Sequence, residues 1–311
     1  MRPRRPRSQV VRPFSPGYTL IELMIVVMIA ILLMVVSLPV AKSVMENARP
    51  REASRIVNTT LFTAKARAAS SGRLAGVEFV LEQAAAAGSY RCTQMYMCEV
   101  PAIYMGDTTD ARATVNNTGV ITFVNSCAAS LPSLLGSSPQ FEIRFNHRGL
   151  WYRVASSSYQ IQNFTTLPSP PIGANGAIFQ IRRAPVRIGN PVELPKSTAI
   201  DMTASGIGQS GMDFNTLTPT TPLQIMFAPA GNAYFPDGAP QGTIHLLIGL
   251  ANKVDGTATT DPERSNLADG NALWVSIGRT SGVITTNENV PGGNLTTARQ
   301  FATNREQQGG L

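Results

Sequence analysis

The longest hydrophobic feature of the chain lies close to its N-terminus. From Leu23 to Ala41, 19 consecutive residues carry no charge, and only Ser37 and Pro39 interrupt the apolar pattern. At a rise of about 1.5 Å per residue, such a helix spans about 28 Å, close to the roughly 30 Å hydrocarbon core of a bilayer. The pattern therefore predicts the transmembrane half of a helix over residues 18–41.

Beyond residue 41 the chain becomes polar but keeps a helical period. Four apolar residues recur at steps of four, three and four, which places them on one helix face: Val57, Leu61, Ala64 and Ala68. Gly72 then offers a C-terminal cap. We predict an amphipathic stem half over residues 42–71. We also expect a helix break at Pro39, because proline removes a backbone hydrogen bond inside a helix, at a cost of about 3 kcal/mol.

After Gly72 the apolar residues come in short runs, separated by Gly, Pro, Ser, Thr and Asn. Several runs alternate apolar and polar residues, as half-buried strands do. The expected strands are Val77–Leu81, Cys92–Met97, Val120–Val124, Phe141–Phe145, Leu150–Val154, Ala177–Arg182, Leu223–Phe227, Thr243–Leu250 and Leu273–Ile277. The run from His245 to Ile248 is continuously apolar after its first residue, which favours a central strand.

These patterns together predict an α+β fold, in which a long N-terminal transmembrane and stem α-helix precedes a β-rich globular head. The head is expected over residues 72–286, with a loop insertion near 156–176 that is rich in Ser, Pro and Gly. Residues 287–311 show no periodicity, so we expect a disordered tail.

Positive charge is concentrated before the apolar run. Five arginines and no acidic residue lie in the basic leader, residues 1–17, which predicts an N-terminus in the cytoplasm and a head in the periplasm. Without the leader, 21 basic residues exceed 19 acidic ones by only two. The basic composition is therefore weak evidence for nucleic acid, which we regard as an unfavoured partner.

A seven-residue motif joins the leader to the apolar run: residues 17–23 read GYTLIEL. A secretory signal peptide fits poorly, because the apolar run is too long and Pro39 stands where a small residue is expected. A plain signal anchor leaves Gly17 and the order of the motif unexplained. The motif resembles the processing site of type IV prepilins and type II secretion pseudopilins. This resemblance implies cleavage after Gly17 by a prepilin peptidase, methylation of the new N-terminus at Tyr18, and an assembly role for Glu22.

Other segments resemble the same family more loosely. Residues 64–73, followed by the strand Gly76–Leu81, resemble minor pseudopilins of the GspH/FimT-like subgroup, as does the final hairpin, residues 274–285. Helical pilins also carry a proline about where Pro39 stands. The resemblance thus implies a pilin-like head, although this head is larger than the family usually carries.

Residue types that support catalysis or metal binding are sparse. His147 and His245 are the two histidines, and no His/Cys cluster has metal-ligand spacing. There is no nucleophile elbow, phosphate loop or dinucleotide fingerprint, so we expect no enzyme activity, no cofactor and no metal centre. Two acidic loops, residues 106–110 and 255–261, lack the order of an EF-hand, and calcium binding there stays open.

The chain has three cysteines, Cys92, Cys98 and Cys127. In an exported domain two of them can pair, and the short loop from Cys92 to Cys98 makes this pair the favoured disulfide. Cys127 is the alternative partner for either residue, and three free buried thiols are the other alternative.

The sequence therefore favours a structural subunit, expected to be a minor one, of a type II secretion pseudopilus or type IV pilus. Its expected partners are a prepilin peptidase, other pilins or pseudopilins contacted through the N-terminal helix, and the inner membrane, which it would cross once before joining the fibre. The alternative is a signal-anchored periplasmic binding or hydrolytic domain. Pilus, secretion pseudopilus and DNA-uptake fibre are not distinguished.

Overall fold

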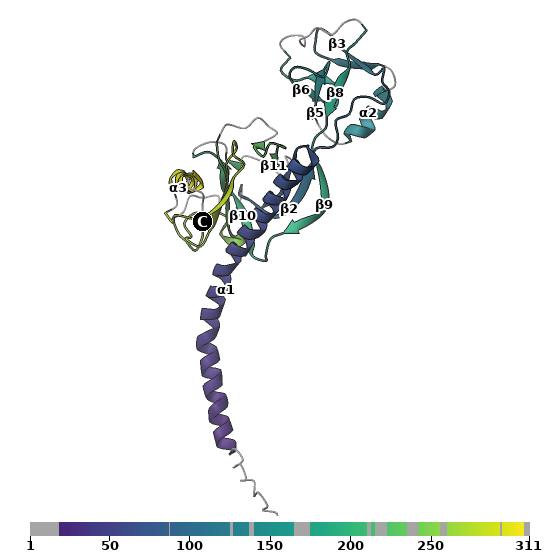
Figure 1. Cartoon of the computed structure of the whole chain (residues 1–311). Coiled ribbons are helices and arrows are strands. Elements are labelled where there is room, and N and C mark those ends of the chain that lie inside the picture. Colours follow the sequence, from purple (N-terminus) through teal and green to yellow (C-terminus); the bar gives the residue numbers. More distant parts are fainter. Residues whose placement is uncertain are drawn as a thin grey trace, which may run out of the picture. The chain divides into compact units, whose positions relative to one another are not determined.

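The structure is a computed structural model. It describes residues 19–86, 88–124, 127–136, 140–164, 175–209, 213–214, 223–234, 242–255, 260–292 and 294–307. The chain divides into two compact units, residues 1–48 and 49–311. Helix α1 (Leu20–Ser71) contributes its first part to the first unit and its second part to the other (Figure 1).

The predicted fold class, α+β with a long N-terminal transmembrane and stem helix, is wrong. The described chain is mostly β-sheet, with fifteen strands. The other helical elements are the short α2 (Cys127–Leu135), η2 (Ala251–Lys253) and α3 (Leu295–Gln307). Helix α1 is not one apolar stem, because from Arg49 onward charged and small polar residues share it with apolar ones. Its second part is instead a packed element of the β-rich unit.

The predicted single-pass location in the inner membrane is contradicted as well. Among the residues that the structure describes, no helix is both long and apolar enough to cross a membrane. The described run of exposed apolar side chains in α1 extends from Leu20 to Val35 and contains Glu22.

The largest element of the second unit is an antiparallel sheet of nine strands in the order β12-β11-β1-β2-β10-β13-β14-β15, with β9 paired to β2. The strands are β1 (Ala75–Gln83), β2 (Tyr90–Glu99), β9 (Val186–Glu193), β10 (Thr198–Ile207), β11 (Leu223–Phe227), β12 (Ala233–Tyr234), β13 (Ile244–Leu250), β14 (Leu273–Ile277) and β15 (Ile284–Glu288). Strand β13 lies between β10 and β14 and is almost fully buried, which confirms the predicted central strand.

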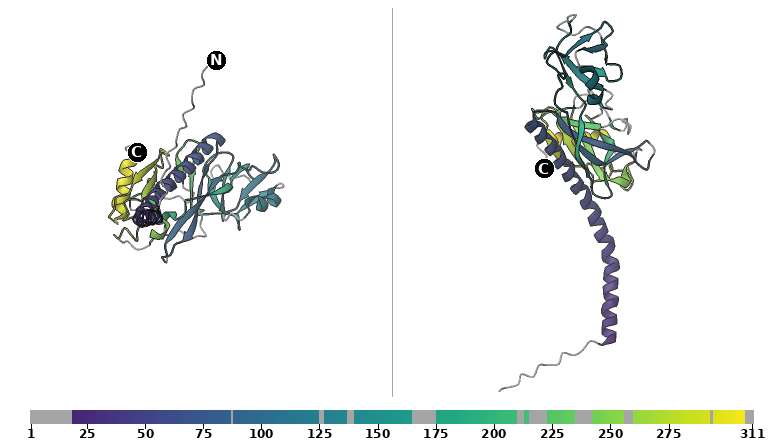
Figure 2. Two further views of the ribbon diagram at one scale, coloured as in Figure 1. Left: turned by 90° about the horizontal axis from the view of Figure 1, so that it is seen from below. Right: turned by 90° about the vertical axis from the view of Figure 1, so that its right-hand side faces the viewer.

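The second part of α1 packs along this sheet (Figures 1 and 2). The predicted stripe of Val57, Leu61, Ala64 and Ala68 is confirmed, since all four side chains are fully buried. They share one core with Val77 of β1, Ile225 of β11 and Val275 of β14. The hydrophobic pattern of residues 57–68 thus predicts the face that packs against the β-rich unit correctly.

Two smaller sheets share a second core. One pairs β3 (Arg112–Val115) with β4 (Ile121–Val124), and the other has the order β7-β6-β5-β8. The strands of the latter are β5 (Gln140–Phe145), β6 (Tyr152–Ala155), β7 (Gln160–Ile161) and β8 (Phe179–Arg182). Helix α2 and aromatic residues such as Phe123, Phe141 and Phe179 complete this core.

The end of the chain differs from the expected disordered tail. Strand β15 extends to Glu288, and α3 forms a helix beside β14 and β15 (Figure 2). Among residues 295–304 of α3, for which burial is described, Ala298, Arg299 and Ala302 are buried, so this part of the helix has no stripe of large apolar residues that a sequence pattern would show. Within the expected loop insertion near 156–176, the structure forms β7, and residues 165–174 lie outside the described residues.

Candidate functional site

The candidate site is the start of α1, where the GYTLIEL motif leads into the helix. Gly17 and Tyr18, the predicted cleavage and methylation positions, lie outside the described residues. Thr19 directly precedes the first helical residue, and Glu22 is the third residue of the helix. The structure therefore describes the last five of the seven residues of the motif.

Thr19 and Glu22 form a reciprocal pair of hydrogen bonds. The backbone N–H of Glu22 donates to Thr19 Oγ1 at 3.3 Å, and the backbone N–H of Thr19 donates to Glu22 Oε2 at 3.4 Å. The Thr19 hydroxyl also donates to the same carboxylate oxygen at 3.5 Å. This is a capping box, which satisfies N–H groups that otherwise lack partners at a helix N-terminus. The carboxylate also complements the positive end of the helix dipole.

The capping box gives Glu22 a local structural role that the sequence analysis did not assign. Its signal was present in the sequence, because Thr followed three residues later by Glu, directly before an apolar run, is the pattern of a capping box. Both contacts of the carboxylate use Oε2. A contact to a further cation through Oε1 is therefore compatible with an intact box.

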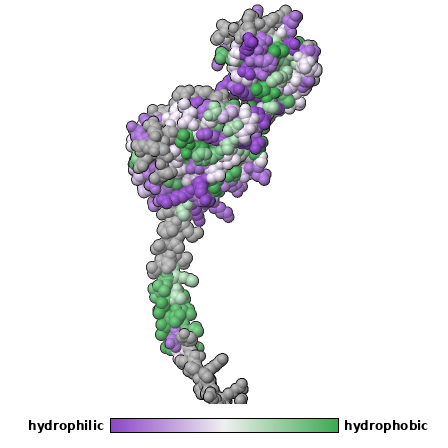
Figure 3. Space-filling view, viewed as in Figure 1, coloured by the Kyte–Doolittle hydropathy of each residue, from purple (hydrophilic) through white to green (hydrophobic). Residues whose placement is uncertain are grey.

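Every large apolar side chain between Leu20 and Val35 is exposed, with exposed fractions from 48% at Val27 to 79% at Leu20 (Figure 3). They are Leu20, Ile21, Leu23, Met24, Ile25, Val26, Val27, Met28, Ile29, Ile31, Leu32, Leu33, Met34 and Val35. The residues cover all sides of the helix rather than one stripe. A helix with this pattern is expected to be surrounded by apolar partners on every side.

The predicted helix break at Pro39 is not observed. Helix α1 runs from Leu20 to Ser71 and continues through both Pro39 and Pro50.

The predicted disulfide between Cys92 and Cys98 is wrong. Cys92 and Cys98 are free and buried, and both lie on β2. Six residues along one strand span about 20 Å, whereas bridged cysteines have Cα atoms about 4.4–6.8 Å apart. Cys92 Sγ donates to the carbonyl oxygen of Gln94 at 3.1 Å, and Cys98 Sγ lies 3.5 Å from Met226 Sδ. Burial raises the pKa of each thiol to about 12, so neither is a reactive thiolate at neutral pH.

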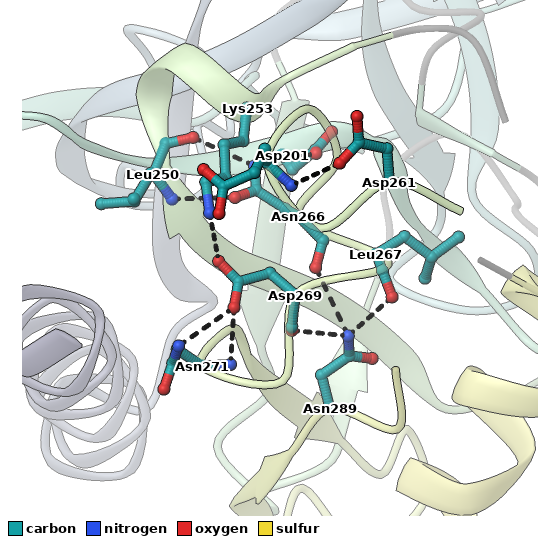
Figure 4. Close-up of polar contacts among 10 residues, drawn as sticks. Asp201, Leu250, Lys253, Asp261, Asn266, Leu267, Asp269, Asn271 and Asn289 are labelled. Carbon is teal, nitrogen blue, oxygen red and sulfur yellow. Dashed lines mark hydrogen bonds and ion pairs between the residues drawn. The ribbon is translucent and has the colours of Figure 1, made fainter. Parts of the chain in front are cut away.

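A buried polar network joins β10 and β13 to the segment between η2 and β14 (Figure 4). Asp201 Oδ1 accepts the backbone N–H of Thr203 at 3.0 Å, and its Oδ2 accepts Asn266 Nδ2 at 3.1 Å. Asn266 also bonds both the N–H and the carbonyl oxygen of Leu250. Burial raises the pKa of the Asp201 carboxyl above its ordinary value.

The same network fixes the neighbouring loop. Lys253 Nζ pairs with Asp269 Oδ2 at 2.7 Å, and both side chains are nearly buried. Asn289 Nδ2 donates to three backbone carbonyl oxygens, those of Asn266, Leu267 and Asp269, while its Oδ1 accepts the indole N–H of Trp274. These polar groups form hydrogen bonds with one another. We therefore interpret the network as a support for the loop rather than a binding site.

The acidic loops considered for calcium hold protein contacts where they are described. Asp107 Oδ1 accepts the Tyr104 hydroxyl at 3.0 Å, and its Oδ2 accepts the Ser130 hydroxyl. Asp255 pairs with Arg264 at 3.5 Å, and residues 256–259 of that loop lie outside the described residues. Within the described ranges, no group of three His, Cys, Asp or Glu residues is placed to hold a metal ion.

His245 and Ser276 form a buried pair, with 3.0 Å between Nδ1 and Oγ, and Thr303 of α3 lies 3.2 Å from Nε2. Arg299 of α3 is fully buried nearby and pairs with Asp213 at 2.7 Å. The carboxylate thus engages an arginine rather than the histidine, and the serine hydroxyl has no access to solvent. This arrangement attaches α3 to the sheet and lacks the geometry of a catalytic triad.

Acidification should destabilise the folded chain through His245. Burial, together with the nearby positive charge of Arg299, lowers the pKa of its imidazole from 6.5 to about 3. The unfolded chain therefore binds more protons, so this contribution is complete above pH 6.5 and is lost as the pH falls toward 3. Between about pH 7 and about pH 4.5 the expected loss is about 2.5 kcal/mol.

Urea unfolding of the full chain and of His245→Gln at both pH values measures this loss. The substitution keeps a hydrogen-bonding side chain but removes the titration, so the pH dependence should shrink by about the same 2.5 kcal/mol. The raised pKa of Asp201 acts with the opposite sign, because protonation favours the folded state, and it is common to both proteins. An unchanged pH dependence in His245→Gln would contradict the assignment.

Comparison with known proteins gives no match: no protein-family model, curated protein or solved structure is significantly similar to this chain.

Proposed function

We propose that the chain is a structural, minor subunit of a type IV pilus or type II secretion pseudopilus. In this proposal a prepilin peptidase removes residues 1–17, and the subunit assembles through the start of α1. The observation that carries the proposal is the all-round apolar surface from Leu20 to Val35, which begins at the capping box inside the GYTLIEL motif. Methylation of Tyr18 is part of the same proposal.

The exposed apolar surface supplies the driving force for assembly. Complete burial of a large aliphatic side chain stabilises by about 1.5–3 kcal/mol, so the fourteen exposed side chains of this segment offer an upper bound of about 20–40 kcal/mol. Association costs about 4–15 kcal/mol in lost translational and rotational freedom. Because the surface covers all sides of the helix, several neighbours are needed to bury it, which favours a fibre over a simple dimer.

Glu22 contributes specificity rather than most of the affinity. A charge pair between its carboxylate and the terminal amine of a neighbour's Tyr18 is worth up to about 4 kcal/mol at about 4 Å and an effective dielectric of about 20, before desolvation is counted. This is small beside the apolar burial. The pair would instead fix the axial register of one helix against the next, since it is satisfied in only one alignment.

The competing proposal is a binding or hydrolytic domain. Among the described residues, one hydrogen-bonded Ser–His pair is found, Ser276 with His245. Both residues are buried, and the histidine also contacts Thr303 of α3. The pair offers no route for a substrate, so no observation favours a hydrolase.

Processing provides the direct test of the proposal. Co-expression with an active prepilin peptidase should yield a chain that begins at Tyr18, with a methylated amine, because the motif places the cleaved bond after Gly17. Intact-mass and N-terminal peptide mass spectrometry measure this. Gly17→Val should retain the leader, since a branched side chain would replace the glycine at the cleaved bond.

The control is the same chain expressed without the peptidase, which should keep residues 1–17. If the leader persists on the unmodified chain although the peptidase processes another prepilin in the same cells, the proposed family role is refuted.

A further inference from the structure

The sheet β7-β6-β5-β8 has one face that is apolar and one that is polar. Along β5, Phe141, Ile143 and Phe145 are buried in the second core, so Glu142 and Arg144 alternate onto the opposite face. The same alternation in the neighbouring strands places Arg153 of β6 and Arg182 of β8 on this outer face, because Val154 and Ile181 are buried in the core.

The strand register brings these residues together. Glu142 lies opposite Arg153 on one side and opposite Arg182 on the other. Arg182 pairs with Glu142 at 2.9 Å, and Arg144 donates to the side-chain oxygen of Gln180 at 2.6 Å. The outer face therefore carries three arginines around one carboxylate.

Trp151, directly before β6, contacts two of these arginines. The guanidinium carbon of Arg182 is 4.2 Å from the centroid of its ring, and that of Arg144 is 4.7 Å away. Both distances are typical of cation–π contacts, which hold the indole in a fixed orientation. Trp151 remains half-buried rather than covered, and the adjacent Leu150 is 74% exposed. We call Trp151, Arg144, Arg153 and Arg182 the tryptophan–arginine platform.

The surroundings of the platform are also basic. Arg148, in the turn between β5 and β6, is exposed. Over residues 101–185 the sequence contains six arginines and three acidic residues, and five of those arginines lie between residues 144 and 183. A local excess of positive charge attracts polyanions, although the whole chain without its leader is nearly neutral.

We propose that the tryptophan–arginine platform binds single-stranded nucleic acid. In this proposal the arginines contact phosphates of the strand, and an unpaired base stacks on Trp151. A sheet face that combines an aromatic ring with a basic track is the arrangement by which proteins bind single strands with little dependence on sequence. The bases of a duplex are stacked on each other and cannot stack on the indole ring. A polyanion without aromatic groups cannot stack on it either. The proposal is independent of the processing and assembly proposed above.

Fluorescence anisotropy with a labelled oligothymidylate tests the platform in the full chain, kept in detergent because of the exposed apolar residues of α1. With about three phosphate contacts, the logarithm of the binding constant should fall with the logarithm of salt concentration with a slope of about −2. Trp151→Ala should weaken binding about 5- to 150-fold and leave the slope unchanged, because stacking releases no counterions. Arg182→Gln should reduce the slope by about 0.7.

Intrinsic fluorescence gives a second readout. The chain has two tryptophans, and Trp274 is fully buried, so quenching on addition of the oligonucleotide would report Trp151. Trp151→Phe should retain most of the affinity, which separates a stacking role from a loss of fold. Arg55→Gln is the matched charge control, because Arg55 is an exposed arginine of α1 paired with Glu52, away from the platform, and its loss should not change binding.

Three results would overturn the proposal. One is the absence of binding at low salt by the folded chain. Another is equal affinity for Trp151→Ala and the unchanged chain. The third is equal competition by heparin and by unlabelled oligothymidylate at matched charge, which would identify a polyanion surface without base stacking.

Discussion

Glu22→Gln is expected to reduce incorporation of the subunit into its fibre at least tenfold. Glutamine at the third helical position can keep the capping box with Thr19, so the substitution removes the charge and retains the local structure. A lost helix cap costs about 1 kcal/mol, whereas the charge pair is worth up to about 4 kcal/mol. The charge therefore decides the result, and Glu22→Leu, which removes both interactions, should be only slightly worse than Glu22→Gln.

Two variants complete the series. Thr19→Ala removes the cap acceptor and keeps the charge, so incorporation should fall only slightly. Glu22→Asp keeps the charge on a shorter side chain and should be intermediate. Cross-linking to neighbouring subunits in sheared fibres measures incorporation, and the mass of the processed chain confirms that cleavage continues. Normal incorporation of Glu22→Gln together with a loss in Glu22→Leu would assign Glu22 to capping alone.

The features of this fold that can be predicted from the sequence are those whose signal lies within a short segment. The capping box spans four residues, and the buried stripe from Val57 to Ala68 spans twelve, so both are legible in the sequence. The central position of β13 follows from its continuous apolar run for the same reason. Each of these features depends on the period of one element, which residue spacing reports directly.

The disulfide prediction was wrong for a reason already present in the sequence. The alternating pattern predicts a strand over Cys92–Met97, and β2 extends that strand to Glu99. Two cysteines on one strand cannot approach each other, so a strand prediction extended by one residue would have excluded the pair.

The fold class was misjudged because one apolar run received too much weight. The second part of α1 belongs to the β-rich unit, whose strands dominate the described chain. Contacts that depend on strand register, such as those of Trp151 with Arg144 and Arg182, likewise leave no signal in a single sequence.

Arg299→Met is expected to destabilise the second unit by about 1–3 kcal/mol. The guanidinium is fully buried, pairs with Asp213 and donates through Nε and Nη2 to the carbonyl oxygen of Ala204. Methionine fills a similar volume but takes both donors away from the carbonyl oxygen of Ala204, whereas the Asp213 side chain is 35% exposed and can be solvated. A buried acceptor that loses its hydrogen-bond donors costs about 1–3 kcal/mol.

The loss should appear first at α3, because Arg299 is its main polar contact with β10. Ala298 and Ala302 bury little apolar area against Trp274, so they cannot hold the helix alone. Hydrogen exchange should therefore show faster opening of Leu295–Gln307 in Arg299→Met than in the unchanged chain, at a pH near 7.

Two matched variants decide between a specific and a general effect of arginine loss. Arg299→Lys keeps the charge but replaces the planar guanidinium by one ammonium group. This group cannot contact the carbonyl oxygen of Ala204 and the carboxylate of Asp213 with the same geometry. The variant should therefore recover only part of the stability. Arg55→Met removes an exposed arginine from the pair with Glu52 and should leave unfolding unchanged, since exposed pairs contribute little. If Arg299→Met unfolds at the same urea concentration as Arg55→Met, α3 is held by its apolar contacts and the buried arginine is not its anchor.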